Sequence, residues 1–164
     1  MGMTQMGLIF WPLSFLFWNK PQRLLELTLI GGIFQAAAIM TIGGMGLQPP
    51  VAPSLCFICY VGLQIVLGAR FPMAPRALHL CAPLLAVGVW TLAGSVIMPR
   101  LFHNQVLVWP QKLDAVGTKT LLAPSHGNYT QDCYVILDLV MLVMTVCFLM
   151  RREANFRRLY GAYI

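Results

Sequence analysis

Charged side chains are scarce in this sequence. Of its 164 residues, five are acidic and eleven are basic, so that only 10% are charged while 59% are hydrophobic. A soluble domain usually has about a quarter charged residues, and a membrane helix needs about 20 residues. The composition therefore predicts an all-α fold: a polytopic transmembrane helix bundle of about four to five spans, forming one integral membrane domain over residues 1–164 without a soluble domain.

The sequence also lacks the patterns of common catalytic and metal sites. It has no GxSxG, HExxH, Walker A or strand-linked GxGxxG motif. Cys56 and Cys59 form one CxxC inside an apolar run, with no second CxxC to complete a zinc site, so we interpret them as small buried hydrophobic residues. His103 and His126 are too isolated to predict a metal site. We expect no metal and no cofactor.

Five apolar segments make up most of the chain. They cover residues 7–18, 24–45, 54–69, 78–98 and 133–150. At 1.5 Å per residue the last segment is roughly 27 Å long, close to the hydrocarbon core of about 30 Å. The first is short and contains Pro12, which leaves open whether it is a span, a re-entrant helix or an interfacial segment. Residues 99–132 form the one long hydrophilic connection.

The basic residues predict the orientation in the membrane. Lys20 and Arg23, and Arg70 and Arg76, flank apolar segments. The last segment is followed by four arginines: Arg151, Arg152, Arg157 and Arg158. Because Lys and Arg are retained on the cytoplasmic side, the C-terminus is predicted to be cytoplasmic and the connection 99–132 to lie outside. We expect the basic tail, 151–164, to contact the anionic inner leaflet. The lipid bilayer, rather than nucleic acid, is the expected partner.

Acidic residues are candidates for function or for structural pairing. Asp138 is the one charged residue of the segment 133–150. Ionisable groups within spans are costly and often functional, so Asp138 has either a proton- or substrate-linked role or a structural hydrogen bond, with Gln131 or Tyr134 as partner. Glu26 lies at the start of the segment 24–45, where it can pair with Arg23 or offset the helix dipole.

The stretch before the last apolar segment carries a family resemblance. Residues 121–131 include Pro124, Asn128, Thr130 and Gln131. They resemble the Pro-x-x-x-Asn-x-Thr-Gln motif that precedes an apolar helix in bacterial O-antigen polymerase and O-antigen ligase-like membrane proteins. The chain is similar to the N-terminal part of these proteins in further stretches, namely residues 12–15, 21–26, 34–38, 42–44 and 46–49.

This resemblance implies a role in cell-envelope polysaccharide assembly at the bacterial inner (cytoplasmic) membrane. The implied substrate is a polyprenyl-pyrophosphate-linked glycan. Proteins of the family are much longer, and a large periplasmic loop late in their chain carries the basic residues that handle this glycan. No residue of the present sequence matches that loop, so no catalytic residue is assigned. We expect that the chain does not catalyse the reaction alone, and whether it is part of an enzyme stays open.

Two other functional hypotheses stay open. The chain could be a small accessory subunit of a larger membrane complex, since its size, its Gly- and Ala-rich segments and the lack of catalytic motifs suit a packing role. It could also be a small transporter, which needs polar groups along a path through the membrane. Gln35, Gln64 and Asp138 are the candidates for such a path.

Overall fold

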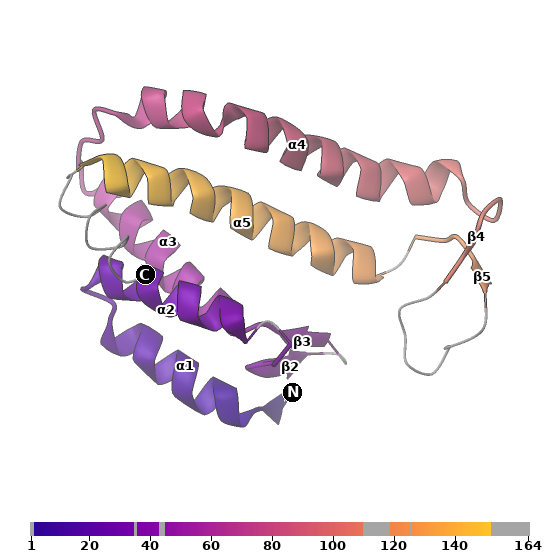
Figure 1. The fold of residues 1–164 in the computed structure, drawn as a ribbon, viewed down its shortest axis with the longest axis horizontal. Helices are drawn as coiled ribbons and strands as arrows, with labels where there is room; N and C mark the ends of the chain where they lie inside the picture. Colours follow the sequence, from indigo (N-terminus) through magenta and orange to yellow (C-terminus); the bar gives the residue numbers. More distant parts are fainter. Residues whose placement is uncertain (1, 35, 43–44, 110–118, 125, 152–164) are drawn as a thin grey trace. The chain divides into compact units, whose positions relative to one another are not determined.

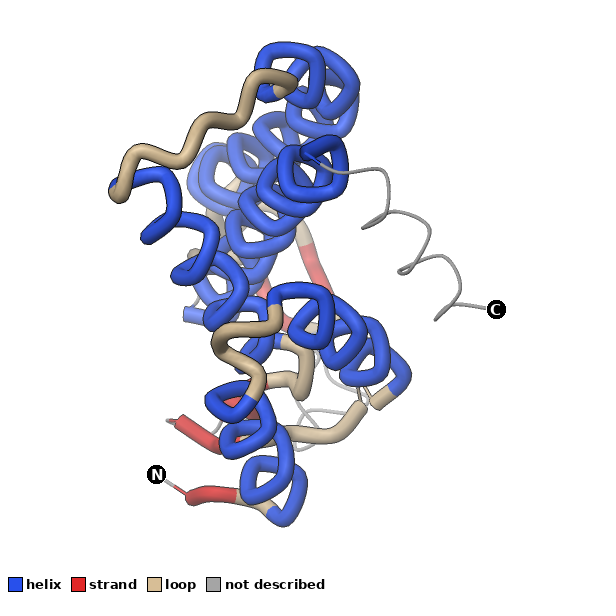
Figure 2. The backbone as a smooth tube through the Cα atoms, turned by 90° about the vertical axis from the view of Figure 1, so that its left-hand side faces the viewer, coloured by secondary structure: helices blue, strands red, loops and turns tan. Residues whose placement is uncertain are grey.

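The structure, a computed structural model, is mainly helical. It describes residues 2–34, 36–42, 45–109, 119–124 and 126–151. These residues form five helices and five short strands (Figures 1 and 2). The elements are β1 (Gly2–Met3), α1 (Gln5–Leu16), α2 (Pro21–Ile33), β2 (Met40–Ile42), β3 (Met45–Leu47), α3 (Val51–Val66), α4 (Ala74–Leu101), β4 (Leu107–Val108), β5 (Thr120–Leu121) and α5 (His126–Arg151).

Two of the described helices are long and apolar enough to cross a membrane. Helix α4 has 28 residues and α5 has 26, which at 1.5 Å per residue gives about 42 and 39 Å. Only 11% of the most apolar window of each is buried, whereas the core helix of a soluble protein would be mostly buried. Helices α1 and α3, with 12 and 16 residues, are shorter than the hydrocarbon core. The described residues therefore contain two candidate spans.

The chain divides into two compact units. One contains Met1–His79 together with the residues from Val140 onward, and the other contains Leu80–Leu139. One of the two hydrophobic clusters described in the first unit lies between α2, α3 and the end of α5. Its buried residues are Leu24, Leu25, Cys56, Phe57, Val61, Met141 and Phe148. The rings of Phe57 and Phe148 meet edge to face with centroids 5.6 Å apart, a favourable aromatic geometry. Cys56 is buried as expected, whereas Cys59 is exposed.

Helix α2 begins where its sequence favours a helix start. Pro21 occupies its first position, where the missing N–H costs no hydrogen bond and the fixed φ suits the first turn. One turn further, Arg23 Nη1 lies 2.8 Å from Glu26 Oε2. The expected pairing of Glu26 with Arg23 is confirmed.

The apolar segment expected over residues 24–45 is not one helix. Helix α2 ends at Ile33, and β2 and β3 form an antiparallel hairpin in which Met40 is opposite Leu47. Ile39, just before β2, is fully buried, and its N–H donates to the Leu47 carbonyl at 2.7 Å. Two glycines precede the helix end, and each is about 1 kcal/mol less favourable in a helix than alanine. Hydropathy alone does not distinguish a buried strand from a helix in such a run.

The connection expected over residues 99–132 is not a long loop throughout. Helix α4 continues to Leu101 and α5 begins at His126, so the last part of the expected loop is helical. Between them, β4 and β5 pair antiparallel, with Leu107 opposite Leu121. The low hydropathy of the residues at the start of α5 predicts a loop, although polar residues form the ends of many helices.

Candidate functional site

Helices α4 and α5 lie antiparallel within the second unit (Figure 1). A Cβ added to Gly88 of α4 would lie 2.5 Å from Cδ1 of Leu139 on α5, so the two helices approach closely at this level. Two helical turns after Gly88 on α4 and two turns before Leu139 on α5, the hydroxyl of Ser95 donates to the carboxylate of Asp132. The same two faces therefore meet at both levels, first through an apolar contact and then through a polar one.

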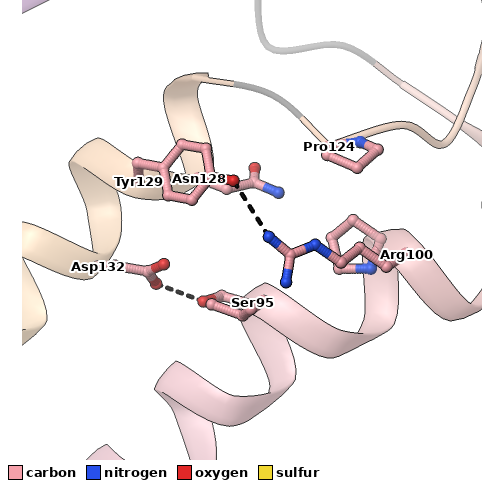
Figure 3. A pocket seen from close by; sticks show the side chains of 8 residues that line it. Ser95, Arg100, Pro124, Asn128, Tyr129 and Asp132 are labelled. Atoms are coloured by element: carbon pink, nitrogen blue, oxygen red, sulfur yellow. Dashed lines mark hydrogen bonds between the residues drawn. The ribbon is translucent and has the colours of Figure 1, made fainter.

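A polar hollow lies beside the Ser95–Asp132 contact (Figure 3). Helix α4, helix α5 and the segment before α5 all contribute to it. The lining residues are Ser95, Val96, Pro99, Arg100, Pro124, Asn128, Tyr129 and Asp132. The space between them is about 220 Å³, including the part open to solvent. Its enclosed part measures only about 10 Å³, room for about one water molecule, so this hollow is a shallow surface feature that a larger molecule can contact rather than enter.

Helix periodicity places these residues together. Asn128 and Asp132 are four residues apart, one turn along the same face of α5, and Ser95 and Pro99 have the same relation on α4. The Ser95 hydroxyl also lies 3.0 Å from the Leu92 carbonyl. Because the hydroxyl has a single proton and a carboxylate is the stronger acceptor, the bond to Asp132 dominates.

Arg100 supplies the positive charge of the hollow. Its Nη2 donates to the Tyr129 hydroxyl at 3.4 Å, a long hydrogen bond, and the residue is exposed. Among the described residues it forms no ion pair. A guanidinium has five N–H donors in a planar fork, which suits phosphate and carboxylate groups. The hollow therefore combines one available cation with the polar side chains of Asn128 and Tyr129.

The motif predicted from the sequence is brought only partly into this site. Pro124 and Asn128 line the hollow, whereas Thr130 and Gln131 do not. The sequence did not assign Ser95, Arg100, Tyr129 or Asp132 to a site, although all four line the hollow. The four-residue spacing of Asn128 and Asp132 is the signal from which a shared helix face could have been predicted.

Comparison of the chain with protein-family models, curated proteins and solved structures found no match. Its function is therefore inferred from its own residues and their geometry.

Asp138 does not belong to the hollow. Its side chain is exposed on α5, and among the described residues it has no hydrogen-bond partner. The expected structural bond to Gln131 or Tyr134 is therefore not formed in the described part of the chain. A role for Asp138 in proton or substrate movement stays a hypothesis.

Arg151 contacts protein groups at the end of α5. Its Nη1 donates to Oε1 of Gln64 at 2.8 Å, and its guanidinium lies 5.3 Å from the ring centroid of Phe71. The Nε2 of Gln64 in turn donates to the Tyr60 hydroxyl at 2.7 Å. Gln64, a candidate for a transport path, is thus engaged in this cluster. Arg152, Arg157, Arg158 and Gln35 lie outside the described residues.

Proposed function

We propose that this chain is an integral protein of the bacterial inner membrane that takes part in cell-envelope polysaccharide assembly. It would act as a relative of the N-terminal part of O-antigen polymerases and ligases, and it would not catalyse the reaction by itself. One observation carries this proposal. Pro124 and Asn128 of the family-like motif line the same polar hollow as Arg100, a cation suited to a pyrophosphate.

The distribution of basic residues supports the orientation. If α4 and α5 cross the membrane, Arg70, Arg76 and Arg151 lie at one end of the two helices, and the hollow with Arg100 lies at the other. The end with Arg70, Arg76 and Arg151 then faces the cytoplasm, and the remaining tail arginines follow Arg151 in the sequence. The proposal places α2 and α3 in the membrane as shorter helices and leaves open whether α1 crosses it, giving four to five membrane helices in total.

The proposed role of the hollow is to hold the glycan carrier at the outer surface. A lipid-linked substrate keeps its polyprenyl chain in the bilayer and its pyrophosphate at the headgroup level. Arg100 would bind an oxygen of this pyrophosphate, while Asn128 and Tyr129 offer hydrogen bonds to the adjoining sugar. The Ser95 hydroxyl donates to Oδ1 of Asp132 and directs this oxygen toward α4, while the carboxylate keeps its charge, which Arg100 would have to offset.

Gene deletion with complementation tests this function. Deletion should change the length or attachment of surface polysaccharide on a gel. The wild-type gene and Gln131→Ala, which alters an exposed motif residue outside the hollow, should restore the pattern, whereas Arg100→Gln should not. Unchanged polysaccharide after deletion would contradict the proposal. If the protein then co-purified stoichiometrically with a larger membrane protein in mild detergent, the accessory-subunit hypothesis would replace it.

A further inference from the structure

The hairpin of β4 and β5 has an exposed apolar face. Leu107 lies opposite Leu121, and their side chains are 60% and 50% exposed. Side chains alternate along a strand, so Trp109, two residues beyond Leu107, continues the same face and is 62% exposed. The ammonium of Lys119 lies 5.5 Å from the centroid of the Trp109 ring. Two leucines, a tryptophan and a lysine thus share one side of the hairpin, which we call the Trp109 face.

This face is held close to the ends of α4 and α5. Asn104 has a positive φ of 58°, which turns the chain directly after α4, and asparagine tolerates this conformation better than most residues. The Asn104 N–H donates to the Leu122 carbonyl at 3.0 Å, and the Leu122 N–H donates to the Val106 carbonyl at 2.8 Å. These two hydrogen bonds close the base of the hairpin a few residues after α4 ends at Leu101. The hairpin is therefore kept close to the ends of the two helices.

We propose that the Trp109 face lies in the headgroup region of the outer leaflet, as an interfacial anchor of the α4–α5 pair. The proposal rests on the membrane orientation of the proposed function. Tryptophan is enriched at membrane interfaces, where its ring lies at the headgroup level. Lysine can bury its aliphatic stem there and direct its ammonium toward lipid phosphates. Leu107 and Leu121 enter the upper acyl region, and this explains why they are exposed in the absence of lipid.

Two single-tryptophan variants test this placement in the full chain. Trp11, Trp18 and Trp90 are changed to Phe to leave Trp109, or Trp11, Trp18 and Trp109 are changed to leave Trp90. Trp90 is the control because it lies near the middle of α4 and is 77% exposed. Each variant is reconstituted in phosphatidylcholine–phosphatidylglycerol vesicles whose acyl chains carry bromine either near the headgroup or near the methyl end. Trp109 emission should fall more with the shallow bromine, and Trp90 emission more with the deep one.

The outcomes separate this inference from the proposed function. If Trp90 is quenched by deep bromine while Trp109 is quenched only by aqueous iodide, the interfacial anchor is refuted and the membrane placement of α4 stands. If bromine quenches neither residue, the membrane placement fails and the anchor fails with it. In the Trp109 variant, Leu107→Asn should reduce shallow quenching, whereas Thr120→Asn on the opposite face should leave it unchanged. Equal effects of the two substitutions would overturn the assignment of the face.

Discussion

Substituting Gly31 tests a close approach between α2 and the residue preceding α3. Gly31 lies in the last turn of α2 and is buried, and a Cβ added there would be 2.9 Å from the Pro50 nitrogen and 3.0 Å from its Cα. Pro50 immediately precedes α3, so these are backbone atoms that no side-chain rotation can move. At the adjacent Gly32 an added Cβ would meet no atom within 4 Å. Gly32→Ala is therefore the matched control for Gly31→Ala.

The two substitutions should change stability in opposite directions. Each replaces glycine by alanine in a helix, which favours folding by up to about 1 kcal/mol. Gly31→Ala additionally forces α2 away from the start of α3, and overpacking of this kind costs about 1–3 kcal/mol. The difference between the variants isolates the steric cost, because the helix propensity terms are similar. At about 2–4 °C per kcal/mol for a chain of this size, Gly31→Ala should melt about 2–12 °C below Gly32→Ala.

Thermal unfolding in mild detergent, followed with a thiol-reactive fluorophore, measures this difference. Cys56 and Cys81 are buried and react only on unfolding, whereas Cys59 and Cys133 are exposed and set the initial signal. A Tm for Gly31→Ala equal to or above that of Gly32→Ala would refute the close contact between α2 and the residue preceding α3.

Three further predictions use the same unfolding assay or backbone exchange. Ser95→Ala removes the hydroxyl that donates to Asp132 and should destabilise the α4–α5 pair by about 0.6–2 kcal/mol. Ser95→Thr keeps the hydroxyl and should lose less stability. Equal losses of stability in the two variants would contradict the hydrogen bond. Asn104→Val places a β-branched residue at φ 58° and should lower stability by about 1–2 kcal/mol, while Asn104→Gly should be neutral or stabilising; a neutral valine variant would refute the turn. Arg151→Lys keeps the charge but loses the fork that reaches Gln64, so amide hydrogen exchange in the last turn of α5 should accelerate, and unchanged exchange would count against this contact.

The sequence predicted those features that depend on local length and spacing. The apolar runs predicted α4 and α5, and the position of Glu26 near Arg23 at the start of an apolar segment predicted their pair. It did not predict that α2 ends at Ile33, because the apolar residues that follow suit either a helix or a hairpin. The hollow was also missed, because Ser95 and Asp132 come together only through the register of two separate helices.

That register has a consequence for how the two helices can pair. The contacts of Leu139 with Gly88 and of Asp132 with Ser95 occur together in a single alignment. Sliding α5 by about one turn in one direction would bring Asp132 opposite Pro99, which has no side-chain donor. Sliding it in the other direction would bring Leu139 opposite Leu84, where a bulky side chain replaces the glycine. One glycine and one serine on α4 thus discriminate against both misaligned pairings during assembly of the hairpin.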